Sequence, residues 1–184
     1  MPGCTQSAPN ASPEVIAAVS HRNAGPPRLT LLTMLNNRTD AGAHTSLVIA
    51  ASETVLFDPA GSFRARGVPE RNDVLFGFSP RVEAAYISAH ARSTHRVVEQ
   101  RLVVTAAQAD RAYRLALAAG PVPGALCTKA TADLLRKVPG FETLRSGFYP
   151  QTLMADFGEL PGVQTFLHRE SDDPSLEAAL VLLN

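Results

Sequence analysis

Residues 44–58 read HTSLVIAASETVLFD, and this stretch decides the fold class. It contains two short apolar runs rich in β-branched residues, 44–50 and 54–58, with Ala51-Ser52-Glu53 between them. Runs of this kind, separated by a few small or polar residues, are typical of a β-hairpin. The sequence therefore predicts two antiparallel strands, with His44 at the start of the first and Asp58 at the end of the second.

Strands and helices are expected on both sides of this hairpin. Residues 29–35 and 95–104 are short apolar runs interleaved with polar residues, which favours strands. Thr105 and Gln108 form a capping-box pattern, so a helix should begin there and stop at Gly120. The other expected elements are a polar loop up to residue 72, helices at 80–92, 126–139 and 150–157, a strand at 163–168, and a helix or strand at 175–183. A small antiparallel sheet packed with a few helices belongs to the α+β class.

The composition fits a single domain that binds no nucleic acid. The chain has 184 residues with 17 basic and 17 acidic side chains, so its formal net charge is zero. Phosphate recognition needs a surplus of Lys and Arg, and base stacking needs aromatic side chains, which make up only 6% of this chain. No apolar run reaches the roughly 18 residues of a membrane span. We therefore expect one domain over residues 29–184 and no nucleic-acid partner.

No metal or cofactor site is expected. His90 and His95 lie close together in the sequence, but no Cys or Glu at helical spacing completes a zinc site. Gly61 and Gly67 do not form a phosphate-binding loop. The two cysteines have no C-x-x-C spacing, which argues against a small redox or zinc protein.

Residues 1–28 are rich in Pro, Ser, Asn, Gly and Ala, which predicts a flexible lead-in. Within it, the segment Met1-Pro2-Gly3-Cys4 resembles the end of a bacterial lipoprotein signal, in which a lipidated Cys follows a small residue. The charged and apolar regions of such a signal are not visible in this sequence. Two interpretations stay open. Either Cys4 carries a lipid and attaches a periplasmic protein to the membrane, with Cys4 as its only attachment, or Cys4 is an ordinary tail residue of a soluble protein.

Cys127 is the candidate nucleophile. It lies at the predicted first turn of a helix, directly after Gly124-Ala125-Leu126. Free N–H groups and the helix dipole at that position favour a thiolate over a thiol. The structural alternative is a core side chain, because free Cys is among the most buried residue types. A catalytic thiolate also needs a base and a group that orients the base.

His44 and Asp58 are the candidates for these two roles. They lie 14 positions apart, a separation that a hairpin folds back into neighbours. Asp58 could then bond one ring nitrogen of His44 and fix its tautomer, as in other triads. Each residue has a structural alternative, His44 as a hydrogen-bonded strand residue and Asp58 before Pro59 as a turn initiator. The prediction of a triad therefore depends on the combination of the three residues.

The order of these motifs resembles the circularly permuted NlpC-type papain-like superfamily, which includes relatives of lecithin:retinol acyltransferase and several bacterial lipoproteins. Residues 42–49, 55–61 and 126–135 carry the resemblance and read GAHTSLVI, VLFDPAG and LCTKATADLL. In that superfamily the Cys is the nucleophile, the His is the base and a third polar residue orients the His. The resemblance thus implies a permuted papain-like fold with Cys127, His44 and Asp58 in these roles. Relatives often have a second His or a Glu where this chain has Asp58.

The function implied by the resemblance is that of a cysteine hydrolase, a peptidase or amidase that forms a thioester acyl-enzyme. Its substrate would be a peptide, amide or ester, for example of the cell envelope. Two alternatives stay open: a lipid acyltransferase or thioesterase, and a non-catalytic binding or scaffold protein of the same fold. Arg64 and Arg66, in the loop after Asp58, form either a clamp for a substrate carboxylate or phosphate, or a solvated surface loop.

Overall fold

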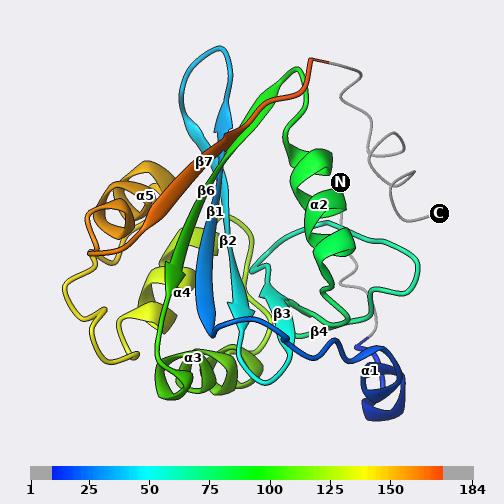
Figure 1. The fold of residues 1–184 in the computed structure, drawn as a ribbon. Helices are drawn as coiled ribbons and strands as arrows, with labels where there is room; N and C mark the ends of the chain where they lie inside the picture. The colour runs from blue at the N-terminus through cyan, green and yellow to red at the C-terminus, as the bar shows by residue number, and fades with distance from the viewer. Residues whose placement is uncertain (1–9, 172–184) are drawn as a thin grey trace.

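One antiparallel sheet is the framework of the domain (Figure 1). The structure is a computed structural model and describes residues 10–171. Over these residues the chain forms five helices and seven strands in the order β4-β5-β3-β2-β1-β6-β7. All neighbouring strands are antiparallel and the sheet is open. The expected α+β class is confirmed.

The predicted hairpin forms next to the centre of the sheet. The strands are β1 (Arg28–Asn36), β2 (Gly42–Ala50), β3 (Thr54–Phe57), β4 (Glu70–Arg71), β5 (Val74–Leu75), β6 (His95–Val103) and β7 (Gln164–His168). In the hairpin, Leu47 of β2 lies opposite Phe57 of β3, and Ala50 lies opposite Thr54. The strands expected at 29–35, 95–104 and 163–168 correspond to β1, β6 and β7.

The helices begin at local capping signals. They are α1 (Pro13–Val19), α2 (Pro80–His90), α3 (Ala106–Ala118), α4 (Cys127–Leu135) and α5 (Pro150–Gly158). The predicted capping box is present at α3, where Thr105 and Gln108 each bond the other's backbone N–H. At α2 the Ser79 side chain accepts the N–H of Val82, and Pro80 occupies the first turn. The helices expected near residues 80, 126 and 150 therefore form α2, α4 and α5.

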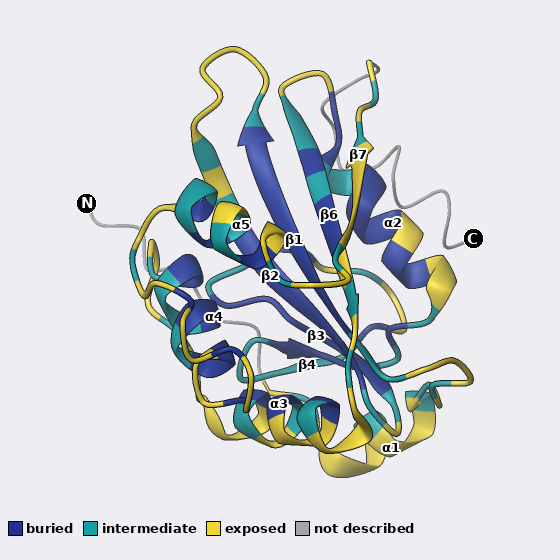
Figure 2. Cartoon of the chain, turned by 60° about the vertical axis from the view of Figure 1, so that its left-hand side comes forward, coloured by how far each residue is buried: buried dark blue, intermediate teal, exposed yellow. Residues whose placement is uncertain are grey.

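Both faces of the sheet are covered by helices, as Figures 1 and 2 show. Side chains such as Leu31 and Leu47 pack in one apolar cluster with α3, α4 and α5. Their neighbours Leu32 and Val48 point to the opposite face and pack in a second cluster with α2. The alternation of apolar and polar residues in β1 is imperfect because both of its faces are buried.

The two strands of the hairpin have different lengths, and this difference creates the place where the site forms. β3 ends at Phe57, opposite Leu47, whereas β2 extends back to Gly42. Residues 42–46 of β2 pair with β1 on one side and with no described strand on the other. The start of α4 packs here, where the hydroxyl oxygens of Thr45 and Thr128 lie 3.1 Å apart.

Two features of the fold were not predicted. Part of the expected lead-in forms α1, whose first turn is capped by the Ser12 side chain, and the N–H of Ala11 donates to the carbonyl of Glu70 in the domain. The strand β4 lies within the expected polar loop and β5 directly follows it, and with two residues each they are too short to show a period in the sequence.

Some expectations concern parts of the chain that the structure does not describe. Cys4 and the element expected at 175–183 lie outside residues 10–171. Within residues 10–171, none of the helices has the length and apolar character needed to cross a membrane.

Candidate active site

Cys127, His44 and Asp58 meet where β2 extends beyond the end of β3. His44 is the third residue of β2, and Asp58 directly follows β3. Cys127 is the first residue of α4 and contacts His44 through its thiol. The hairpin brings the His and the Asp together, and α4 brings the Cys to the same open edge. The structure thus brings together all three residues that the sequence singles out as a triad.

His44 and Asp58 form a close and mostly buried pair. Nε2 of His44 lies 2.7 Å from Oδ1 of Asp58. The Asp58 side chain is 1% exposed, whereas 17% of the His44 side chain is in contact with solvent. Because Asp58 engages Nε2, Nδ1 is the ring nitrogen that remains for the thiol of Cys127.

Cys127 lies at a helix start that favours an anionic sulfur. Besides His44, the backbone N–H of Thr45 and the hydroxyl of Thr128 donate to the sulfur, the latter from 3.9 Å. No side chain caps α4, so the unpaired N–H groups and the dipole of its first turn favour a negative charge near Cys127. The preceding Ala125 has a φ of +66°, a strained value for a residue other than Gly, and this bend leads the chain into α4.

The three groups shift one another's ionisation. Burial opposes charge on Cys127, but the hydrogen bond and positive charge of His44 outweigh it and lower the pKa of the thiol from 9.0 to about 7. Burial also opposes charge on His44, but hydrogen bonds to Asp58 and Cys127 raise the pKa of the imidazole from 6.5 to about 10. Between these two values the site holds a thiolate and an imidazolium. Thiolate character is the property that a cysteine nucleophile needs.

Tyr86 holds Asp58 from the other side, a role that nothing in the local sequence indicates. Its hydroxyl donates to Oδ1 of Asp58 over 2.7 Å and lies 3.1 Å from the hydroxyl of Ser46. A phenol has one proton, so Ser46 is the donor to Tyr86. Burial of Asp58 favours its neutral form, but the bonds from His44 and Tyr86 outweigh this and lower the pKa of the carboxyl. Tyr86 falls within the helix expected at 80–92, and because a buried phenol generally needs a hydrogen-bond partner, its burial is the signal that accompanies this role.

Replacing Tyr86 by Phe is expected to reduce kcat/KM with an activated ester about 10-fold, because a hydrogen bond to a charged acceptor contributes on the order of 1.5–3 kcal/mol. The ring and its packing stay, and only the donor to Asp58 is lost. Tyr113→Phe is the matched control, since that hydroxyl bonds Glu53 outside the site. Equal rates for the two variants would show that the phenol of Tyr86 does not support Asp58.

A tight turn places Asp58. The N–H of Gly61 donates to the carbonyl of Asp58 over 2.9 Å, and Ala60 has a φ of +58°. Pro59 at the second position and a positive φ at the third define a type II turn. Asp73 ties this turn to the segment before α4, because its carboxylate accepts the N–H groups of Ala60 and Val122 at 3.1 and 2.8 Å.

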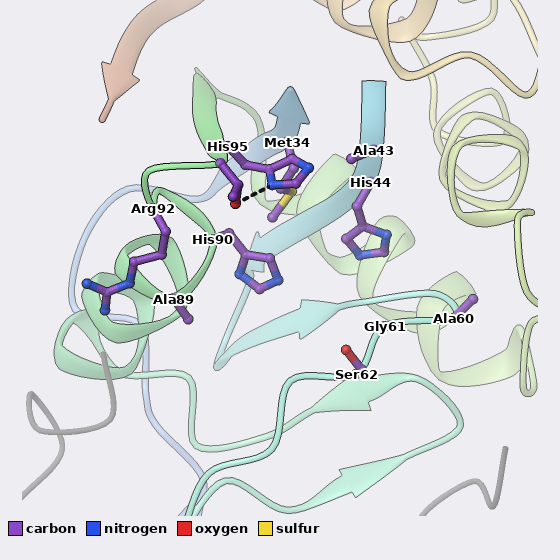
Figure 3. A pocket seen from close by; sticks show the side chains of 11 residues that line it. Met34, Ala43, His44, Ala60, Gly61, Ser62, Ala89, His90, Arg92 and His95 are labelled. Carbon is purple, nitrogen blue, oxygen red and sulfur yellow. Dashed lines mark hydrogen bonds between the residues drawn. The ribbon is translucent and has the colours of Figure 1, made fainter. Parts of the chain in front are cut away.

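A small polar cavity of about 330 Å³ lies beside His44. Figure 3 shows His44 from β2 and His90 from the end of α2 extending towards it, with Ser62 from the loop after β3 on a third side. His95 and Arg92 also line the cavity, whereas Cys127 does not. The cavity therefore borders the imidazole of the triad and not the sulfur.

Other candidate residues do not join the triad. Arg64 lies 2.8 Å from the carboxylate of Glu70, and Arg66 is exposed. Neither of them lines the cavity beside His44, so their role as a substrate clamp stays a prediction. Nδ1 of His95 bonds the hydroxyl of Thr94 at 2.9 Å. Among residues 10–171, no group of three or more His, Cys, Asp or Glu side chains is arranged to hold a metal ion.

The site combines a nucleophile of lowered pKa, a base in contact with it and a buried carboxylate that orients the base. Comparison of the chain with family models, curated proteins and solved structures finds no match. The chemistry of these side chains is therefore the basis on which a function can be assigned.

Proposed function

We propose that this protein is a cysteine-dependent hydrolase that transfers an acyl group through a thioester on Cys127. The observation that carries the proposal is the continuous contact from the Cys127 thiol through His44 to the buried Asp58. Buried charged groups are costly unless they are paired, and a protein core has no need of this arrangement. Perturbed pKa values of several groups in contact are typical of catalytic sites.

The first half of the reaction follows from the ion pair. The Cys127 thiolate attacks the carbonyl carbon of an amide or ester, and a carbon–sulfur bond forms. The carbonyl oxygen becomes an oxyanion, for which the backbone N–H of Cys127 at the start of α4 is a suitable donor. His44 then gives its proton to the leaving amine or alcohol as the carbon–nitrogen or carbon–oxygen bond breaks. The product of this half-reaction is an acyl-enzyme.

The second half restores the enzyme. Water or another nucleophile attacks the thioester carbonyl, and the sulfur leaves again as a thiolate. The proton that the attacking nucleophile loses passes to a base or to solvent. His44 regains a proton from solvent after it has protonated the first leaving group, and the imidazolium, held by Asp58, stabilises the leaving thiolate. The net reaction is hydrolysis when the acceptor is water.

The chain order of the site supports a permuted papain-like arrangement as the finer description of the fold. The His lies on β2, the orienting carboxylate follows β3, and the Cys opens α4 much later in the chain. We propose peptide amides or related esters as substrates, in keeping with the resemblance. Attachment to the envelope through Cys4 and a periplasmic location are part of this proposal.

The test is the reactivity of Cys127 towards iodoacetamide between pH 5 and 9, measured in the full chain with Cys4 replaced by Ser. We expect the alkylation rate to rise with a midpoint near pH 7, because the reactive thiolate forms as pH rises through the thiol pKa. In His44→Ala the midpoint should move upward by about one to two pH units, since the imidazolium no longer stabilises the thiolate.

Two controls make this test decisive. His21→Ala removes an imidazole next to the far end of the hairpin and should leave the midpoint unchanged. Circular dichroism should show that both variants fold. An unreactive Cys127, or a midpoint that does not respond to loss of His44, would overturn the proposal and favour a non-catalytic binding protein of the same fold.

A further inference from the structure

The cavity beside His44 contains a second imidazole that the triad does not use. The ring of His90 is nearly parallel to that of His44, with an angle of 18° and a distance of 6.4 Å between the ring centroids. It also packs against the ring of Tyr86, at 4.3 Å between centroids. Both His44 and His90 line the same cavity, and Figure 3 shows their two rings next to each other.

The hydrogen bonds of His90 fix its tautomer. Nδ1 lies 2.8 Å from the backbone carbonyl oxygen of Tyr86. A carbonyl oxygen can only accept, so Nδ1 carries the proton, and Nε2 of the neutral ring presents a lone pair. Within residues 10–171 the structure shows no hydrogen-bond partner for Nε2. This nitrogen is therefore free to accept a hydrogen bond from a molecule in the cavity.

We propose that His90 is a second base of the site, whose Nε2 accepts the proton of the acyl acceptor, a water molecule or a small amine or alcohol bound in the cavity beside His44. This inference rests on the proposed function. The cavity borders the imidazole of His44 and not the sulfur. His44 protonates the leaving group, so the leaving group departs on the His44 side of the sulfur, and an acceptor bound in this cavity would arrive on the same side. His44 contacts the sulfur, so an acceptor beside its ring lies next to the acyl group that the sulfur carries.

The charges around the two rings support different roles for them. Burial lowers the pKa of His90, and the bond to the Tyr86 carbonyl and the nearby Asp58 only partly oppose this, while His44 and His95 add to it. His90 is therefore neutral at pH 7 and able to accept a proton. Acylation removes the part of the rise in the His44 pKa that Cys127 causes, but the hydrogen bond and charge of Asp58 remain and favour the imidazolium, which cannot accept a proton.

The proposed step conserves atoms, protons and charge. As the acceptor attacks the thioester, a new carbon–oxygen or carbon–nitrogen bond forms, and the acceptor's proton passes to Nε2 of His90. The carbon–sulfur bond breaks and Cys127 leaves as a thiolate beside the His44 imidazolium. His90 then releases its proton to solvent, and His44 has taken up one proton from solvent since it protonated the first leaving group. No oxidant, reductant or metal is needed.

The decisive variant is His90→Asn in the Cys4→Ser chain. The Asn side-chain N–H₂ can still donate to the Tyr86 carbonyl, as Nδ1 of His90 does, but the base is gone. The probe is 4-nitrophenyl acetate, which acetylates Cys127 and releases a coloured product. The acetyl-enzyme is isolated, and loss of the acetyl group is followed by intact-mass spectrometry at pH 7.5.

We expect acetylation by the His90→Asn variant to proceed within about 3-fold of the Cys4→Ser rate, and the acetyl-enzyme to live about 100-fold longer, within the 10²–10⁴ range of general-base catalysis. Hydroxylamine, which needs no base, should cleave both acetyl-enzymes at similar rates. His21→Asn, a matched change away from the cavity, should leave the lifetime unaltered.

The outcomes separate this inference from the proposed function. If the Cys4→Ser protein acetylates Cys127 but the His90→Asn acetyl-enzyme decays as fast as that of His21→Asn, His90 is not the base, and the thioester mechanism stands. If hydroxylamine also fails to cleave the variant's acetyl-enzyme, the substitution has closed the site and the role assigned to Nε2 is overturned. If Cys127 is not acetylated in the Cys4→Ser protein, the proposed function falls and the role of His90 falls with it.

Discussion

Asp58→Asn is expected to lower kcat/KM for ester hydrolysis about 10³-fold, because the amide keeps the shape of the side chain but removes its charge. Asp58 is buried, and its Oδ1 holds both Nε2 of His44 and the hydroxyl of Tyr86. Without this anion, burial favours the neutral imidazole, and the pKa of His44 should fall. The pKa of Cys127 should then rise, since the imidazolium beside the sulfur is what offsets its burial.

The measurement combines the ester kinetics with the pH dependence of Cys127 alkylation. The alkylation midpoint of the Asp58→Asn variant should lie above the value near 7 expected for the unchanged site, so the thiolate fraction at neutral pH falls. Asp156→Asn is the control, since Asp156 pairs with Arg145 on the surface of α5. A small loss of rate with an unchanged midpoint would show that Asp58 only orients the ring and does not maintain its charge.

The sequence was sufficient for those parts of the site that depend on local pattern. The two short β-branched runs at 44–50 and 54–58 predicted the hairpin, and the hairpin brings His44 and Asp58 close. The position of Cys127 at a helix start also followed from the local sequence, as did the capping box at Thr105. These features are set by residues within a few positions of one another.

The sequence was not sufficient for the contacts that depend on packing between elements. Tyr86 lies 28 positions from Asp58, and nothing around it distinguishes a core tyrosine from a ligand of the triad. The sequence suggested His90 only as a possible metal ligand. Its place beside His44 could not be predicted, because the orientation of its ring is set by the end of α2 and by the Tyr86 carbonyl. β2 is longer than β3, and this difference leaves free the edge of β2 against which Cys127 and the start of α4 pack. The difference can be recognised only when the strand register is known.

The role of Gly61 also depends on packing and could not be predicted from the sequence, where Gly61 is only one of two glycines that do not form a phosphate-binding loop. A Cβ added at Gly61 would lie 2.0 Å from Oδ2 of Asp58 and 2.2 Å from its Cγ, far inside any real contact. Only a residue without a side chain lets the turn after β3 pass so close to the carboxylate. The requirement here is close approach, a role for glycine that is independent of backbone twist.

Gly61→Ala should therefore act through Asp58. The carboxylate is held by His44 and Tyr86 and cannot move away without loosening at least one of these bonds. We expect kcat/KM to fall at least about 100-fold, in the direction of Asp58→Asn, and the free energy of unfolding to fall by about 1–3 kcal/mol, the usual cost of overpacking a well-filled site. Ester kinetics and urea denaturation measure the two effects. Gly147→Ala is the control, because a Cβ there meets nothing within 4 Å.

A double substitution shows whether the effect of Gly61→Ala passes through the carboxylate. In the Asp58→Ala background the atoms that the new Cβ would meet, Oδ1, Oδ2 and Cγ, are absent. Gly61→Ala should then cost little stability, so the two substitutions together should destabilise the protein by at least about 1 kcal/mol less than the sum of the single changes. Strict additivity would mean that the added methyl group disturbs the backbone of the turn itself, and that the close approach of Gly61 to Asp58 does not control the triad.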